Sequence, residues 1–197
     1  MTDLFRSLRG SALASGAAIS LVVALISQCT AATEDVAVKA GAPKATVDLS
    51  SSGFKEGKTI PKEFTADGKD ESPPLKWTGV PAEAKSLALI CDDPDAPVGT
   101  WVHWVIYDLP AGSQELAGSL PTRETLPSGA RQGLNSWKNV GWGGPSPPPG
   151  KPHRYFFKLY ALDKKLDLAA GADKQKLLAA MKDHVLAQAK LMGTYGR

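Results

Sequence analysis

Apolar residues in the middle of the chain fall in short runs separated by Pro and Gly. Runs of this length, bounded by turn-forming residues, are typical of β-strands. The run at 101–107 is apolar at both alternating sets of positions, which indicates a strand buried on two faces. Its one ionisable residue is His103. The sequence predicts strands at residues 47–49, 75–77, 86–91, 101–108 and 155–162.

Helical periodicity is confined to the last part of the chain, from about residue 173 to residue 191. Asp173 is placed to cap the start of this helix, and Gly193 is placed to end it. His184 lies in the helix with no chemical motif around it, which indicates a structural or exposed histidine. The apolar stripe predicts a face packed on the core, formed by Leu177, Leu178, Met181, Val185, Leu186 and Ala189.

The segment from residue 111 to residue 152 is rich in Gly, Pro, Ser and Asn, and it predicts at most one short strand. Loops of this length in compact domains are usually functional or disordered. Trp137 and Trp142 argue against disorder. The loop is therefore a candidate for part of a functional site.

The N-terminus has the pattern of an export signal. Basic residues precede an apolar stretch at about 12–26, which is too short and too rich in Ala, Ser and Gly for a membrane-spanning helix. Cys29 resembles the lipidated cysteine of a lipoprotein signal, whereas Ala31 and Ala32 suit ordinary signal peptidase. Both lipid anchoring and free export remain open. We expect a signal peptide at 1–29, a flexible tether at 30–46 and one folded domain at 47–197.

The composition fits one well-buried domain, with 197 residues of which 43% are hydrophobic and 22% charged. The net charge of +3 falls to near neutrality without the signal, so no nucleic-acid partner is predicted. The sequence has no P-loop, dinucleotide fingerprint or CxxC pair, and no cofactor is predicted. Loss or lipidation of Cys29 leaves Cys91 alone, and Cys91 is expected to be a small buried hydrophobe without a disulfide.

Two segments combine prolines with ionisable side chains. Residues 91–97 contain Asp-Pro-Asp directly after a predicted strand, and residues 143–155 end in His-Arg-Tyr as another strand begins. Rigid loops at strand ends are how a sheet presents a preorganised site. These residue types leave three chemistries open, which are a two-His-one-carboxylate metal site, an acid–base pair for hydrolysis and a cradle for an anionic headgroup.

In this order and at about this separation, the two segments resemble the signature regions of the phosphatidylethanolamine-binding protein family, which includes the Raf kinase inhibitor proteins. Further motifs at 64–68, 72–77, 132–135 and 184–197 are similar to its bacterial YbhB/YbcL branch. The resemblance covers nearly the whole predicted domain. It implies a mainly β fold, a two-sheet antiparallel β-sandwich with a C-terminal helix and a few short helices.

The resemblance also implies a pocket for phosphate-type anions and the phosphatidylethanolamine headgroup. Ser146 departs from the family pattern, because bacterial relatives often carry Cys there. Imidazole N–H groups and the Tyr155 hydroxyl can donate to phosphoryl oxygens, while Asp93 either orients a histidine or receives an ammonium. Histidine donation predicts that anion affinity rises as the pH falls through about 6.5. The positions that match the family pocket are Asp93, Asp95, Pro97, His103, Gly144, Pro145, His153 and Tyr155.

Two classes of function remain open at this point. The first is a binding protein for a phosphate-bearing small molecule or phospholipid headgroup, with a kinase or protease as a partner it regulates. The second is a hydrolase with His103 or His153 as general base and Asp93 orienting it. Binding is favoured, because no serine stands in a nucleophile-elbow context. The expected location is outside the cytoplasm, either periplasmic, lipid-anchored or secreted, and a homodimer is compatible with this branch.

Overall fold

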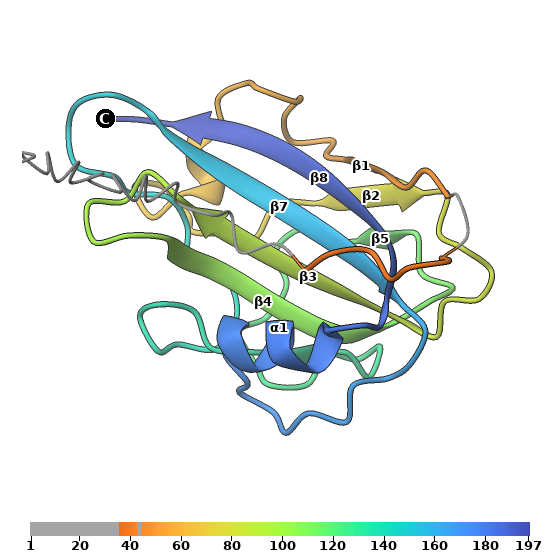
Figure 1. The fold of residues 1–197 in the computed structure, drawn as a ribbon. Helices are drawn as coiled ribbons and strands as arrows, with labels where there is room; N and C mark the ends of the chain where they lie inside the picture. Colours follow the sequence, from red (N-terminus) through yellow and green to blue (C-terminus); the bar gives the residue numbers. More distant parts are fainter. Residues whose placement is uncertain (1–35, 43–44) are drawn as a thin grey trace, which may run out of the picture. The chain divides into compact units, whose positions relative to one another are not determined.

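The computed structural model describes residues 36–42 and 45–197, so the predicted signal peptide and Cys29 lie outside the described residues. Figure 1 shows the elements in chain order. They are β1 (Asp48–Ser50), the 3₁₀ helix η1 (Lys62–Phe64), β2 (Leu75–Thr78), β3 (Ser86–Asp93), β4 (Trp101–Pro110), β5 (Glu115–Leu116), β6 (Arg131–Gln132), β7 (His153–Leu162), α1 (Lys174–Met181) and β8 (Val185–Tyr195).

The strands form two antiparallel sheets. One sheet has three strands in the order β1-β2-β5, and the other has five in the order β6-β4-β3-β7-β8. Pairing between named strands is antiparallel throughout both sheets. This arrangement confirms the predicted mainly β, two-sheet fold.

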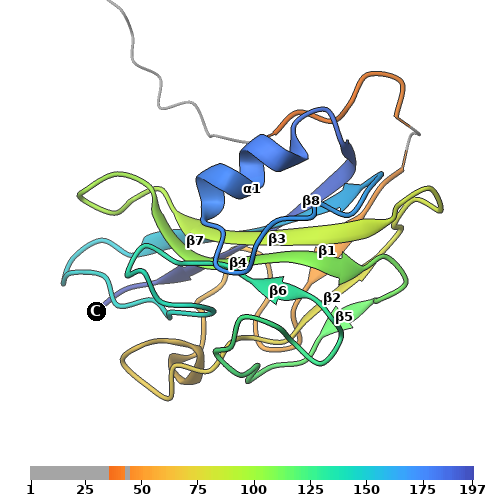
Figure 2. The ribbon, with the colours of Figure 1, turned by 90° about the horizontal axis from the view of Figure 1, so that it is seen from below.

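The five-stranded sheet is covered on both faces. Figure 2 shows α1 on one face and the three-stranded sheet on the other. Alternate residues of β3 serve the two faces, so that Leu89 and Cys91 pack between the sheets while Ala88 and Ile90 pack on the α1 side. Every residue of β3 is buried, which explains its continuous apolar run. At the end of β3 this alternation places the carboxylates of Asp92 and Asp93 on opposite faces of the sheet.

The predicted C-terminal helix is shorter than its periodicity suggested. Helix α1 begins after Asp173, whose side chain accepts a hydrogen bond from the Lys176 N–H at 3.0 Å, and it ends at Met181. Asp183 has a φ of +64°, which breaks the helix, and residues 185–195 form strand β8 instead. The prediction of helix across 185–191 was wrong, because pairing along almost the whole of β7 outweighs the local periodicity.

The segments around this core also make defined contacts. The loop after β4 contributes two short strands, β5 and β6, where the sequence predicted at most one. Lys39, in the part of the tether that the structure describes, donates its backbone N–H to the Val185 carbonyl at 2.8 Å, and its ammonium contacts Asp163 at 2.5 Å.

Within the described residues, no helix combines the length and apolar character needed to cross a bilayer.

Candidate functional site

His103 is the extra residue of a β-bulge in β4. Cys91 and Asp92 are consecutive on β3. Their partners on β4 are Trp104 and Val102, so His103, between these two, has no partner on β3. A bulge interrupts the ladder and re-aims the extra side chain, and bulges are over-represented beside active sites. The bulge is therefore the backbone feature that leaves His103 outside the regular pairing of β4 with β3.

Gly143 fixes this histidine with two hydrogen bonds. The Gly143 N–H donates to the His103 carbonyl at 3.0 Å, and His103 Nδ1 lies 2.6 Å from the Gly143 carbonyl oxygen. Because a carbonyl oxygen only accepts, Nδ1 carries the proton, and Nε2 of the neutral ring is then a hydrogen-bond acceptor. His103 is 2% exposed, and burial lowers its pKa despite the opposing effects of Gly143 and Asp93.

Asp93 holds the second histidine. His153 Nδ1 lies 2.8 Å from Asp93 Oδ2, and the Asp95 backbone N–H donates to Asp93 Oδ1 at 2.8 Å. The Asp93 side chain is 4% exposed and the His153 side chain 13% exposed. Both carboxylate oxygens are engaged by the protein, which is the geometry of an orienting carboxylate and not of a free ammonium receptor. The Nε2 atom of His153 bonds no group among the described residues.

Asp95 anchors the turn after β3 to the start of β7. Its carboxylate accepts hydrogen bonds from Nε and Nη2 of Arg154 at 2.8 and 2.7 Å, and from the Arg154 backbone N–H at 2.9 Å. The bonds from the Arg154 side chain are the largest cause of the lowered pKa of Asp95, and burial opposes them. The pair is half-exposed, and it positions the neighbouring Asp93 and His153.

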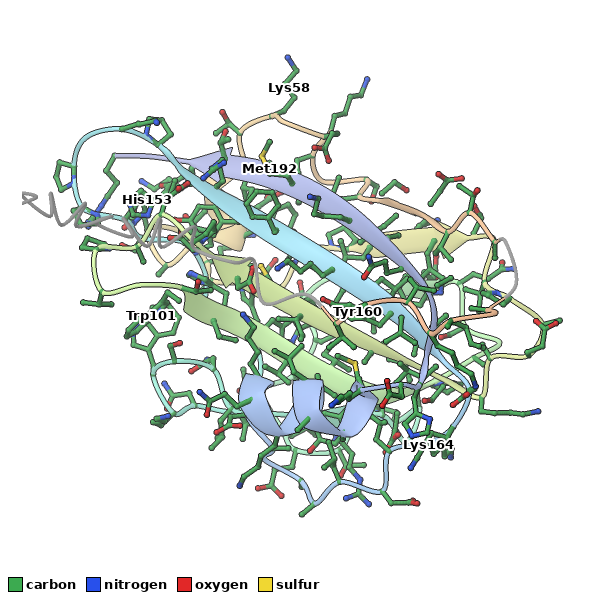
Figure 3. The ribbon with its side chains drawn as sticks, viewed as in Figure 1. Lys58, Trp101, His153, Tyr160, Lys164 and Met192 are labelled. Atoms are coloured by element: carbon green, nitrogen blue, oxygen red, sulfur yellow. The ribbon has the colours of Figure 1, made fainter. Side chains whose placement is uncertain are left out.

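These groups surround a cavity of about 210 Å³. A volume of this size suits a small headgroup and lies below the usual range for drug-sized ligands. Figure 3 shows Trp101 and His153 at one end of the sheet, with Lys164 at the other. None of the described residues that line the cavity is Lys or Arg. The lining residues are Asp93, Ala96, Pro97, Val98, Trp101, His103, Trp137, Ser146, Pro147, Pro148, His153 and Tyr155.

Aromatic rings form one wall of the cavity. The Trp137 ring meets the Trp101 and His103 rings edge to face, with centroids 5.2 and 5.1 Å apart. The Tyr155 ring meets His103 in the same manner at 5.1 Å. Trp137 is 44% exposed and Val98 is 78% exposed, so the mouth of the cavity has an apolar rim.

The loop at residues 143–149 contributes Ser146, Pro147 and Pro148 to the cavity lining, and two aspartates outside the lining support it. The Gly144 N–H donates to Asp70 Oδ1 at 2.6 Å, and the Ser146 hydroxyl donates to Asp67 Oδ1 at 2.9 Å. Gly144 is needed here, because a Cβ atom would come 2.6 Å from Asp70 Oδ1. Asp67 lies in the 64–68 motif that resembles the family, but neither Asp67 nor Asp70 was predicted as a site residue, and both lie more than 70 residues before the loop that they contact.

The cavity gathers most of the predicted residues and excludes three. Asp93, Pro97, His103, His153 and Tyr155 line it. Asp95, Gly144 and Pro145 are absent from its lining and serve the loops around it. Sequence reasoning missed the lining residues Ala96, Val98, Trp101, Pro147 and Pro148, although all lie in or beside the two proline-containing segments.

Two other residues predicted to be structural do not line the cavity. Cys91 is fully buried in β3, and desolvation raises its pKa well above the usual value. His184 lies in the turn before β8, with Nδ1 2.8 Å from Asp163 Oδ1. The Asp163–His184 pair thus repeats the Asp93–His153 contact at a place outside the cavity lining.

A second hollow of about 350 Å³ adjoins the cavity. The two share Pro97, Pro148 and His153. Lys151 lines only the second hollow, which therefore supplies a cation near the mouth. A group large enough to extend beyond the first cavity would have room in this hollow.

The cavity offers both donors and acceptors. Burial, followed by the charge of Asp93, raises the pKa of Tyr155, so its hydroxyl keeps its proton. No described residue accepts a hydrogen bond from this hydroxyl or from the backbone N–H of Ser146. Nε2 of His103 and Nε2 of His153 likewise bond no group in the described part of the chain. Within that part, no group of three or more His, Cys, Asp or Glu is placed to hold a metal ion.

Comparison with known proteins gives relatives that match about three quarters of the chain. The chain is 52% identical over 151 residues to a UPF0098 protein of Methanothermobacter thermautotrophicus, covering 77% of this chain and 99% of the relative. It is 46% identical over 155 residues to a UPF0098 protein of Aquifex aeolicus, covering 78% of this chain and 90% of that one.

Solved structures resemble the fold. A phosphatidylethanolamine-binding protein homologue from Chlamydia trachomatis is 41% identical with a TM-score of 0.71, and E. coli YbcL is 32% identical with a TM-score of 0.72. Each match covers 77% of this chain and 98% of the solved chain. Residues 50–196 also match the sequence profile of one family, described as phosphatidylethanolamine-binding protein. The chain belongs to the phosphatidylethanolamine-binding protein family.

Proposed function

We propose that the protein is a binding protein whose cavity receives the phosphate group of a small ligand, either a free phosphorylated molecule or a phospholipid headgroup. The observation that carries the proposal is the convergence of uncommitted polar atoms on one small cavity. Tyr155 supplies an O–H, Ser146 an N–H, and His103 and His153 each supply a ring nitrogen. Few polar groups placed on apolar walls are typical of ligand sites.

Binding is favoured over hydrolysis by the partners of the hydroxyl and imidazole groups. The Ser146 hydroxyl donates to Asp67 and so is not activated by a histidine. The Nδ1 atoms of His103 and His153 contact a carbonyl and a carboxylate. A nucleophile joined to a base by a hydrogen bond is the signature of covalent catalysis, and none is found among the described cavity residues.

Export and a protein partner belong to the same proposal. The N-terminal export pattern supports a location in the periplasm, outside the cell or on a lipid anchor at Cys29. The exposed rim residues Val98 and Trp137 give a partner such as a protease or kinase apolar surface beside the cavity. A partner bound there would sense whether the cavity is occupied.

The test is calorimetric titration of the full-length protein with phosphoethanolamine. The variant His153→Ala removes a cavity histidine that contacts an aspartate at 2.8 Å. The matched control His184→Ala removes a histidine with the same 2.8 Å aspartate contact outside the cavity lining. We expect saturable binding by the wild type and the control, and its loss in His153→Ala with the fold retained. Equal binding by all three proteins would place the ligand elsewhere, and binding by none would refute the proposed ligand class.

A further inference from the structure

Residues 145–149 form a stiff segment between glycines. The chain reads Gly-Gly-Pro-Ser-Pro-Pro-Pro-Gly over residues 143–150, so every residue between the glycines is a proline except Ser146. A proline ring fixes φ near about −65°, whereas glycine adopts backbone conformations that other residues avoid. Gly150 uses this freedom, with a φ of +144°. The segment can therefore move as one rigid piece, with the bending confined to its two ends.

The prolines leave this segment few ways to hold its position. Among residues 145–149, Ser146 alone has a backbone N–H, and that N–H bonds no described residue. The segment is held through its oxygen atoms instead. One backbone hydrogen bond, from the Ala66 N–H to the Pro145 carbonyl at 3.0 Å, joins it to the loop after η1. Its other hydrogen bonds to described residues come from two charged side chains.

Asp67 is the first of these side chains. Its carboxylate accepts the Ser146 hydroxyl at 2.9 Å and the Tyr195 hydroxyl at 3.0 Å, and Arg197 Nη1 lies 3.6 Å from it. The bond from Ser146 is the largest cause of the lowered pKa of Asp67, and burial opposes it. Tyr195 pairs with His153 across β7 and β8. Asp67 therefore joins the proline segment to the strand that lies beside the cavity histidine.

Arg197 is the second of these side chains. Its Nε donates to the Pro147 carbonyl at 2.7 Å, and its backbone carbonyl accepts the Gly150 N–H at 3.4 Å. The guanidinium is half-exposed, so it holds the segment from outside the core. Pro147 lines the cavity, and Pro148 lines both the cavity and the second hollow. The contacts of Arg197 therefore bear on the shape of both spaces.

We propose that residues 145–149 are a flap over the cavity, and that Asp67 and Arg197 are positioning residues that latch it. With the latch formed, the flap presents its lining residues to the cavity in one fixed position. With the latch released, the flap moves about its glycine ends, and the cavity and the second hollow lose their boundary at Pro148. Asp67 and Arg197 lie outside the cavity lining, so they act on a ligand only through the flap. That effect on a ligand rests on the proposed function, whereas the latch itself is a contact within the chain.

The first experiment measures the flap without a ligand. Amide ¹⁵N relaxation of the full-length protein gives order parameters for Ser146 and Gly150, whose N–H groups lie in and beside the flap. We expect values of about 0.85 in the wild type, as for rigid backbone, and below about 0.6 in the double variant Asp67→Asn/Arg197→Ala. Wild-type values in the folded double variant would overturn the latch. If that variant does not fold, Arg197→Ala alone, at a half-exposed position, decides the question by the same comparison.

A second aspartate supplies the matched control. Asp163 accepts hydrogen bonds from Lys39 and His184 at a place outside the cavity lining. The Asp163 side chain is 23% exposed against 18% for Asp67, and the Lys39 side chain is 42% exposed against 44% for Arg197. The double variant Asp163→Asn/Lys39→Ala should leave the order parameters of the flap unchanged. An equal loss of order in this control would indicate a general loosening of the domain and would overturn the latch.

The second experiment measures what the latch does for the cavity. Calorimetric titration with phosphoethanolamine should give an affinity about 3- to 10-fold weaker in the latch double variant than in the wild type, because ordering a mobile flap on binding costs affinity. The control double variant should bind like the wild type. Equal affinities despite a mobile flap would overturn the role of the flap in binding. Absence of binding by the wild type would refute the proposed ligand and not the latch, which the order parameters decide without a ligand.

Discussion

The Tyr155 hydroxyl provides a test that separates binding from stability. Tyr155 is 1% exposed, and its ring packs edge to face on His103 with centroids 5.1 Å apart. The substitution Tyr155→Phe keeps this ring contact and removes only the hydroxyl. Since no described residue bonds that hydroxyl, the folded protein loses no internal hydrogen bond. We expect the free energy of unfolding to change by less than about 1 kcal/mol.

The effect on ligand affinity should be much larger. A hydrogen bond from a neutral hydroxyl to a charged phosphate contributes about 1.5–3 kcal/mol. Its loss corresponds to a roughly 10- to 150-fold weaker affinity for phosphoethanolamine. Urea unfolding measures the first quantity, and calorimetric titration at pH 6 measures the second.

Tyr107→Phe is the matched control. The Tyr107 hydroxyl donates to the Ala169 carbonyl at 2.6 Å and accepts from the Ala172 N–H at 3.3 Å, on the α1 side of the sheet. Removing it should lower the free energy of unfolding by about 1–2 kcal/mol and leave ligand affinity unchanged. The reasoning fails if Tyr155→Phe behaves like this control, losing stability while it keeps its affinity.

Three further predictions concern the protein around the cavity. Gly144→Ala should lower the free energy of unfolding by about 1–3 kcal/mol in urea, since the new Cβ lies 2.6 Å from Asp70 Oδ1 and 2.8 Å from the Phe64 carbonyl oxygen. The pKa of His103 is lowered from 6.5 by burial, so below about pH 6.5 the unfolded chain binds a proton that the folded protein does not. Stability should therefore decrease as the pH falls from 6.5, with a smaller decrease in His103→Asn; identical pH profiles in urea would contradict this. Leu177→Ala, at a fully buried position of α1, should lower the free energy of unfolding in urea by about 2–5 kcal/mol, yet leave phosphoethanolamine affinity unchanged in calorimetry below the melting temperature.

The strands of the core were predictable because their residues are apolar on both faces. The run at 87–91 has no polar position, and β3 there is buried throughout. β8 was not predictable from its own residues, because Leu186, Ala189 and their neighbours fit a helical stripe as well as a strand. Its strand form depends on antiparallel pairing with β7, a contact that periodicity in one segment does not contain.

The candidate site was also predictable only in part. Side chains in the two proline-containing segments were identified, since the resemblance to the family lies in those segments. The bulge at His103 and the support of Gly144 by Asp70 could not be predicted, because both depend on which strands and loops meet in space. Asp67 and Asp70 are ordinary turn-forming residues in the sequence. They support the loop only because folding brings distant segments of the chain into contact.

The bulge in β4 also describes how such a site can arise or vanish. One additional residue separates the regular ladder from the one that presents His103. Deleting a residue there would restore regular pairing at Cys91 and Asp92, while the second register shift, between Leu87 and Leu89, and the strand order would remain. A single codon thus separates a regular sheet end from one that presents His103 to the cavity. In an engineered scaffold of this fold, that codon is the place to add or remove the His103 side chain at the cavity without redesigning the core.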